Sequence, residues 1–177
     1  VLKKAVETVE ETDGLVTIGI RPTFPSTGYG YIKNEEIPDK MYKRVLEFVE
    51  KPDKEHANVY IEAGNYAWNS GMFVWKASTI LSYFEKLLPD IYDKLMIIKE
   101  ALGTGSEYEV IQAIYDTIPK ISIDYGIMER ADRVYMLEGN FGWNDIGSFD
   151  ALPALYASDE KGNVVRGESV LIDSRDN

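Results

Sequence analysis

The stretch LVTIGIRPTFPSTGYGYI, residues 15–32, decides the fold class of this chain. Its first six residues, Leu15 to Ile20, are mostly apolar and β-branched, and they predict a buried strand. That strand must end at Arg21-Pro22, because proline cannot donate a hydrogen bond to a neighbouring strand. TGYGYI, residues 27–32, then predicts a second strand with two glycines inside it.

Outside this stretch, strand patterns alternate with helix patterns. Further strands are predicted at residues 45–52, 71–76 and 134–139, and a strand-like alternation follows Asn163. Helices are predicted at the start of the chain, over residues 78–118 with breaks at Pro89 and 103–105, around 122–131, and after 148. The predicted N-caps are Ser78, Ser106 with Glu109 in a capping box, Ser122 or Asp124, and Ser148. The alternation predicts an α/β structure with a mostly parallel or mixed sheet.

Composition excludes several classes of protein. The 177 residues have 45% hydrophobic content, enough for one core, and a net charge of −11 from 19 basic and 30 acidic residues. Such an acidic chain disfavours binding to nucleic acid and to anionic membranes, and no apolar run is long enough to span a membrane. The absence of cysteine and the single histidine, His56, exclude disulfides, a cysteine nucleophile and a multi-histidine metal site. His56 lies in a polar stretch, which indicates a surface position.

Both ends of the chain indicate a piece of a longer protein. Residue 1 is valine, and VLKKAVET has the apolar spacing of a helix whose beginning is absent. The tail from Asn163 has the pattern of the first strand of a further module. We therefore expect a fragment, although proteolytic removal of an N-terminal segment would give the same appearance.

Short segments at the predicted strand ends carry glycine, aromatic and charged residues, as ligand sites in α/β sheets do. In Glu50-Lys51-Pro52 the carboxylate suits sugar hydroxyls and the ammonium suits a phosphate. Pro52 predicts an extended Lys51, and strand alternation would place the Glu50 and Lys51 side chains on opposite faces. Both reach one ligand only if the backbone bends before Pro52. The alternative is a solvated strand end.

Two further segments leave two interpretations open. Asn69, in Trp68-Asn69-Ser70-Gly71, offers a donor and an acceptor to a hydroxyl-rich ligand, but the same residues are typical of a turn. Asp145 is predicted to lie in a tight loop before a helix, where it would bind Mg²⁺ or cap that helix. Asp124 and Glu129, with Asp145, would also suit a carbohydrate hydrolase, but the sequence does not fix their separation.

Taken together, five segments resemble the mannose-1-phosphate guanylyltransferases over nearly the whole chain. They are TIGIRPTFPSTGYGYI (17–32), EFVEKPD (47–53), NYAWNSGMFVW (65–75), SIDYGIME (122–129) and GWNDIGS (142–148). The resemblance implies a Rossmann-like nucleotidyltransferase fold with a mixed sheet, and a cytoplasmic enzyme. It also implies a reaction in which GTP and mannose 1-phosphate give GDP-mannose and pyrophosphate, with Mg²⁺.

The resemblance also assigns roles to residues. Glu50 and Asn69 would hold sugar hydroxyls, Lys51 would hold the sugar phosphate, and Gly28 and Tyr29 would line the sugar pocket. These five residues form the substrate-binding set that the resemblance implies.

Asp145 would bind the metal, so that Lys51 and Asp145 are the expected catalytic residues. Asp124 is expected to be structural or peripheral to the site. Phe149 stands where many relatives carry tryptophan, a mild change in the pocket wall.

One departure from the family concerns the nucleotide. The family's glycine-rich nucleotide loop and its first metal-binding aspartate precede the segments that match here. We therefore expect residues 1–160 to be the sugar-phosphate-binding part of the domain, without its N-terminal nucleotide-binding part, and residues 161–177 to begin a linker to a C-terminal module. The 177 residues alone are then expected to be inactive. The alternative is a non-catalytic sugar-phosphate-binding or assembly module, and exposed sheet edges predict a homo-oligomer.

Overall fold

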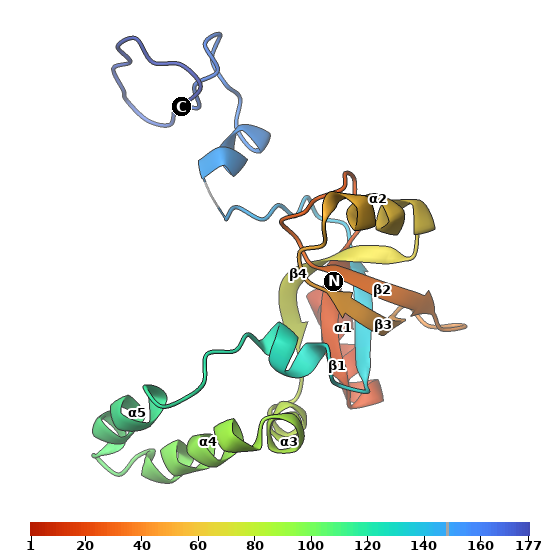
Figure 1. The fold of residues 1–177 in the computed structure, drawn as a ribbon, viewed down its shortest axis with the longest axis vertical. Helices are drawn as coiled ribbons and strands as arrows, with labels where there is room; N and C mark the ends of the chain where they lie inside the picture. Colours follow the sequence, from red (N-terminus) through yellow and green to blue (C-terminus); the bar gives the residue numbers. More distant parts are fainter. Residues whose placement is uncertain (148) are drawn as a thin grey trace. The chain divides into compact units, whose positions relative to one another are not determined.

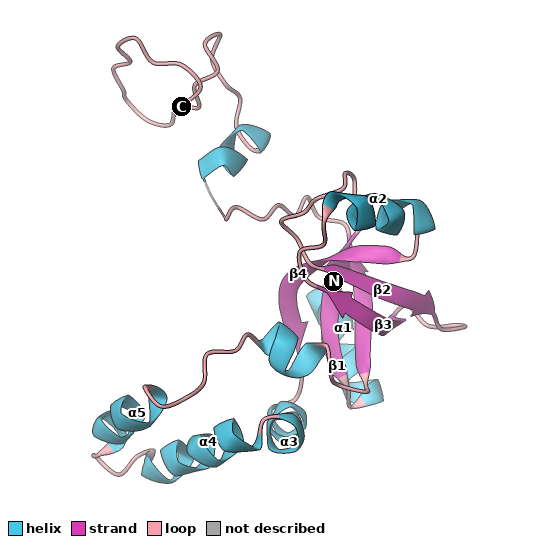
Figure 2. Ribbon diagram, in the orientation of Figure 1, coloured by secondary structure: helices cyan, strands magenta, loops and turns pink. Residues whose placement is uncertain are grey.

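The computed structural model describes residues 1–147 and 149–177 (Figures 1 and 2). Contacts divide the chain into two compact units, Val1–Phe141 and Gly142–Asn177. The boundary expected at residue 160, between the sugar-phosphate-binding part and a linker, stays a prediction. The first unit contains the strands β1 (Leu15–Ile20), β2 (Tyr31–Glu36), β3 (Lys43–Val49), β4 (Tyr66–Val74) and β5 (Val134–Gly139). Its helices are α1 (Leu2–Thr12), α2 (Lys54–Ala63), α3 (Ala77–Leu87), α4 (Pro89–Ala101), α5 (Glu107–Tyr115) and the π-helix η1 (Asp124–Met128).

The strands form a closed barrel in the order β1-β4-β2-β3-β5. β1 and β5 are parallel and the other pairs are antiparallel, so the sheet is mixed and the alternative of a mostly parallel sheet is wrong. Closure rests on two residue pairs between β3 and β5, Lys43 with Met136 and Arg44 with Tyr135. Because this order joins the two ends of the described sheet, the expected exposed end strands are wrong. Self-association stays a prediction without that support.

β1 is buried on both faces, and its predicted bounds are confirmed. Leu15 is fully buried in a cluster with residues of α3 and η1, and Val16 packs with Ala5 and Val9 of α1. The strand therefore lies between two apolar layers, as its nearly continuous apolar sequence indicates. α4 packs between α3 and α5, as Figure 1 shows.

Several strand bounds differ from prediction around the site. β3 ends at Val49, so Glu50 and Lys51 follow this strand, whereas the predicted strand over 45–52 included them. β2 begins only at Tyr31, whose side chain is fully buried, so Gly28 and Tyr29 belong to the preceding loop. β4 begins at Tyr66, five residues before the predicted start, so Asn69 lies within a strand and not in a turn. Gly71 takes a left-handed φ of 71° there, and the register with β1 shifts. A bulge of this kind keeps turn-like residues inside a strand, which explains the ambiguous pattern.

The helix starts show where sequence patterns were insufficient. α2 was not predicted, although the Asp53 side chain accepts a hydrogen bond from His56 N at 2.9 Å and so caps it. The predicted cap Ser78 is wrong, because α3 begins at Ala77. Ser106 does occupy the N-cap of α5, but its side chain makes no capping hydrogen bond, so the capping box is wrong. The His56 side chain is exposed, as predicted.

The second unit holds the 3₁₀-helix η2 (Phe149–Ala154). The predicted cap Ser148 lies outside the described residues. No strand forms after Asn163 in the described tail, so the strand-like alternation there is wrong. Across the described part of the chain, no helix has both the length and the apolar character needed to cross a membrane.

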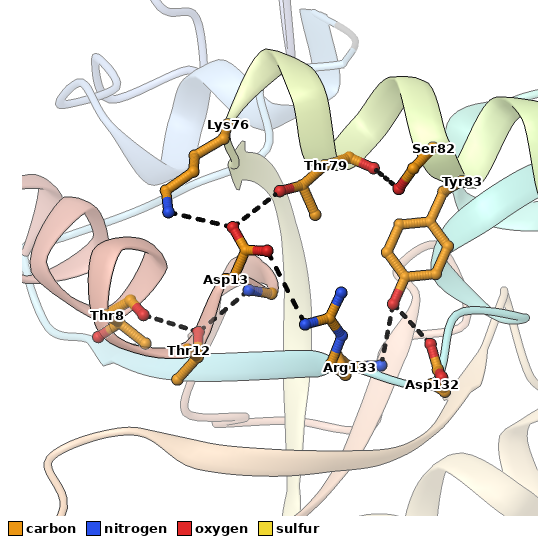
Figure 3. Close-up of polar contacts among 10 residues, drawn as sticks. Thr8, Thr12, Asp13, Lys76, Thr79, Ser82, Tyr83, Asp132 and Arg133 are labelled. Carbon is orange, nitrogen blue, oxygen red and sulfur yellow. Dashed lines mark hydrogen bonds and ion pairs between the residues drawn. The ribbon is translucent and has the colours of Figure 1, made fainter.

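Asp13 ties the end of α1 to the start of α3 (Figure 3). It follows α1 with a left-handed φ of 51°. Its Oδ1 accepts hydrogen bonds from Lys76 Nζ at 3.0 Å and Thr79 Oγ1 at 3.2 Å, and Arg133 Nη1 lies 3.9 Å from Oδ2. The hydrogen bond from Lys76, followed by that from Thr79, lowers the pKa of Asp13. Asp13 therefore joins the end of α1 to the start of α3 and to the residue before β5.

The Asp13 contacts predict a pH-dependent stability. Because folding lowers the pKa of Asp13, its contribution is present above the unfolded-state pKa and is lost as pH falls through the folded-state pKa. We expect Asp13→Asn to lower Tm at pH 7, and the deficit to shrink as pH falls below about 4. Calorimetric scans from pH 7 to pH 3 measure this. Asp93→Asn, an exposed change in α4, serves as the control, and an equal deficit at every pH would contradict the assignment.

Candidate functional site

The predicted residues Glu50 and Asn69 meet at Gly30. A Cβ atom on Gly30 would lie 2.5 Å from Glu50 Oε2 and 3.4 Å from Asn69 Cβ. Asn69 N also donates to Gly30 O at 2.8 Å. A side chain at position 30 would therefore displace the Glu50 carboxylate from its observed place. The structure thus brings the segments around residues 30, 50 and 69 to one place.

Lys51 reaches the same place through a bend in the backbone. Its φ is 44°, in the left-handed region, so the prediction of an extended Lys51 is wrong. This bend lets Lys51 Nζ lie 2.5 Å from Glu50 Oε1, although strand alternation would separate the two side chains. Glu50 is 21% exposed and Lys51 63% exposed. The hydrogen bond to Glu50 is the main cause that raises the pKa of Lys51, so the ammonium stays charged.

Asp124 contacts Asn69 directly. Asn69 Nδ2 donates to Asp124 Oδ1 at 2.8 Å. Asp124 begins the π-helix η1 and is a residue of the helix, so the predicted Asp124 cap is wrong. The alternative cap, Ser122, accepts a hydrogen bond at Oγ from Tyr125 N at 3.4 Å, as an N-cap residue does. π-Helical turns are rare and frequently occur at functional sites. The resemblance implied that Asp124 is structural or peripheral. In the structure it is hydrogen-bonded to Asn69, a residue predicted to bind the sugar.

These side chains form what we call the Glu50–Asn69 cluster: Glu50, Lys51, Asn69, Asp124 and Glu129. Burial is the main cause that raises the pKa of Glu129, and the charges of Asp124 and Glu50 raise it further. The cluster therefore offers carboxylate acceptors, an amide and one exposed ammonium. This combination suits a ligand that carries both hydroxyls and an anionic group.

Gly28 and Tyr29 precede the cluster along the chain. Gly28 N donates to Ser26 Oγ at 3.2 Å, and a Cβ on Gly28 would meet only that hydroxyl within 4 Å. The Tyr29 ring packs edge-on against Trp68, with centroids 5.0 Å apart, and Phe24 packs on the same indole at 4.9 Å. These aromatic contacts hold the loop beside the part of β4 that carries Asn69.

Asp145 belongs to the second unit, Gly142–Asn177. Its side chain is exposed, in a stretch without helix or strand that precedes η2, as the predicted loop required. The neighbouring Asn144 Oδ1 is buried and has no hydrogen-bond partner among the described residues. Carboxylate and amide oxygens are hard ligands that fit Mg²⁺. Within residues 1–147 and 149–177, no group of three Asp, Glu or His side chains is arranged to hold a metal.

Sequence reasoning did not assign Gly30, Thr17 or Asp124 to the site. Thr17 is fully buried in β1, and its hydroxyl lies 3.5 Å from Asn69 Oδ1. The sequence signal for Thr17 was that it is the single polar side chain in the apolar strand β1. For Asp124 the signal was weaker, because no sequence signature distinguishes a π-helix from the ordinary helix predicted around 122–131.

With this geometry in place, comparison with known proteins identifies the class. The sequence profile of the family described as nucleotidyl transferase matches residues 1–162, and the chain belongs to that family. Alginate biosynthesis protein AlgA of Pseudomonas syringae pv. tomato is 39% identical over 175 residues. Mannose-1-phosphate guanylyltransferase of Salmonella montevideo is 38% identical over 174 residues. The matches cover 97% and 94% of this chain but 36% of each relative, so the chain spans about a third of their length.

Solved structures agree in fold. A Thermus thermophilus structure, described as a mannose-1-phosphate geranyltransferase, superposes with a TM-score of 0.78 and 38% identity. The superposition covers 94% of this chain and 47% of that one. A Helicobacter pylori structure, described as a mannose-6-phosphate isomerase, gives a TM-score of 0.65 at 29% identity, over 81% of this chain and 56% of the other. The fold is therefore a mixed α/β nucleotidyltransferase fold.

Proposed function

We propose that this chain is the sugar-phosphate-binding part of a mannose-1-phosphate guanylyltransferase. That enzyme would make GDP-mannose and pyrophosphate from GTP and mannose 1-phosphate. The observation that carries the proposal is the meeting of Glu50, Lys51 and Asn69 at Gly30. Family membership and the names of the relatives support the choice of reaction and sugar.

The roles follow from the chemistry of the groups. Glu50 accepts hydrogen bonds from sugar hydroxyls, and Asn69 donates to one. Lys51 holds the sugar phosphate and aligns its oxygen for in-line attack on the α-phosphate of GTP, while pyrophosphate leaves. No covalent intermediate with the protein is needed, so positioning and charge neutralisation supply the catalysis. Gly28 and Tyr29 line the sugar pocket.

Asp145 is the residue that would hold Mg²⁺ in this proposal. A magnesium site commonly uses one or two carboxylates with substrate phosphates and water, so one exposed carboxylate meets its requirement. The ion would neutralise negative charge on the phosphates when bound. Asp145 keeps its own carboxylate available for that role because its loop leaves it exposed.

The 177 residues contain no glycine-rich loop of the kind that cradles a triphosphate. We propose a Rossmann-like domain whose nucleotide-binding part lies outside them. The chain alone would then bind mannose 1-phosphate without turnover.

Isothermal titration calorimetry of the 177-residue chain tests the proposal. We expect binding of mannose 1-phosphate, and weaker binding of mannose, which lacks the group that Lys51 holds. A parallel assay with GTP, mannose 1-phosphate and Mg²⁺ measures pyrophosphate release, which we expect to be absent. Equal affinity for mannose and mannose 1-phosphate would contradict the role of Lys51. Absence of any binding would refute the proposed function, and turnover would refute the division of the site.

A further inference from the structure

Asn69 can present only one end of its amide to a ligand, and its neighbours decide which. Its Oδ1 accepts from Gly71 N at 3.1 Å, and its Nδ2 donates to Asp124 Oδ1 at 2.8 Å. If the amide were flipped, two N–H donors would face each other at Gly71 and two oxygens would face each other at Asp124. Thr17 Oγ1, 3.5 Å from Oδ1, fits either orientation because a hydroxyl both donates and accepts. Gly71 and Asp124 therefore set the orientation.

This orientation leaves one N–H of Asn69 for a ligand. A primary amide carries two N–H groups, of which Asp124 takes one. The second has no protein partner among the residues that the structure describes. A sugar hydroxyl would therefore meet a donor at Asn69 and an acceptor at Glu50, both of which border the space that a Cβ on Gly30 would enter.

The position of Asp124 is itself fixed by the core. Ile127 and Met128 of η1 are 0% and 1% exposed, and they pack in the cluster that contains Leu15. Gly126 allows this close packing, because a Cβ there would lie 2.9 Å from Leu88 Cδ1. The main-chain oxygen of Asp124 also accepts from Glu129 N at 2.9 Å. A π-helix anchored in this way holds the Asp124 carboxylate in a constant place against β4.

We propose that Asp124 is a positioning residue, which fixes the Asn69 amide so that its second N–H donates to a hydroxyl of the bound sugar phosphate. This inference rests on the proposed function for the identity of the ligand. The orientation of the Asn69 amide does not depend on the proposed function. Asp124 acts through Asn69 and does not touch the substrate.

Calorimetric titration of the 177-residue chain with mannose 1-phosphate, using variants of both residues, tests the inference. We expect Asp124→Ala to weaken binding by about tenfold, the value of one or two hydrogen bonds. Asp124→Asn keeps an acceptor oxygen and should bind within about threefold of the unaltered chain. Asn69→Ala should lose as much as Asp124→Ala, and the double variant should lose no more than Asn69→Ala. Asp116→Ala, an exposed change after α5, is the matched control and should bind normally.

A second measurement needs no ligand and separates the two proposals. In the NMR spectrum, the Asn69 side-chain amide should show one proton that exchanges slowly with solvent, in the unaltered chain and in Asp124→Asn. Fast exchange of both protons in the unaltered chain would overturn the orientation, whether or not the sugar phosphate binds. Normal amide exchange with no binding of mannose 1-phosphate would overturn the proposed function alone. Additive losses in the double variant, or an Asp124→Asn loss as large as that of Asn69→Ala, would overturn the positioning role.

Discussion

Replacing Lys51 by methionine is expected to weaken the binding of mannose 1-phosphate by about tenfold or more, because a hydrogen bond to a charged group is lost. Methionine keeps the length of the side chain and removes the ammonium. The affinity for mannose, which has no phosphate, should change little. Glu50 also loses the ammonium 2.5 Å from its carboxylate, so a small change in mannose binding is expected. Calorimetric titration with both ligands measures the difference.

Lys54→Met is the control for Lys51→Met. Lys54 is exposed in the first turn of α2, three residues along the chain, so that the change in net charge is the same. Normal binding by Lys54→Met with weak binding by Lys51→Met would attribute the effect to position and not to overall charge. Equal losses in the two variants would show that Lys51 contributes only through the net charge of the chain.

Leu15→Ala is expected to have the largest effect on stability. Leu15 is fully buried at the start of β1, where it packs with Ile127 and Met128 of η1. Truncating a buried leucine costs roughly 2–5 kcal/mol of unfolding free energy, through lost burial and a residual cavity. Because that cluster also supports η1, the position of Asp124 should loosen as well. Urea denaturation followed by circular dichroism measures the free energy.

The matched control for Leu15→Ala is Leu46→Ala in β3. Leu46 is 49% exposed, so its truncation should cost within about 0.5 kcal/mol, as for most surface changes. A loss for Leu15→Ala no larger than that for Leu46→Ala would mean that the cluster around β1 is not the core of the first unit.

The sequence was sufficient to predict an element's bounds where only one structure could explain the pattern. The apolar run of β1 predicted its bounds, because a strand buried on both faces leaves no polar position to confuse the pattern. Pro89 correctly marked the start of α4, since proline is favoured at the first position of a helix. The alternation of elements left a mostly parallel and a mixed sheet open, and closure of the barrel depends on two residue pairs between β3 and β5, which no local pattern indicates.

The sequence indicated Glu50, Lys51 and Asn69, which the structure brings together, but it did not indicate their geometry. The adjacent Glu50 and Lys51 were proposed to bind one ligand, but their approach depends on the left-handed φ of Lys51, which the following proline argues against. Asn69 was found as an amide in a turn-like segment, whereas the structure places it in β4 beside a bulge. Its contact with Asp124 joins residues 55 positions apart, which only the tertiary fold determines.

At position 51, thermal stability and ligand recognition favour different residues. A non-glycine residue in a left-handed conformation costs about 1–2 kcal/mol, and asparagine or glycine would relieve much of it. Either replacement would also discard the ammonium proposed to recognise the phosphate. A directed-evolution campaign that selects only for survival on heating would therefore be drawn to position 51, and would enrich sturdier proteins that no longer hold their sugar phosphate.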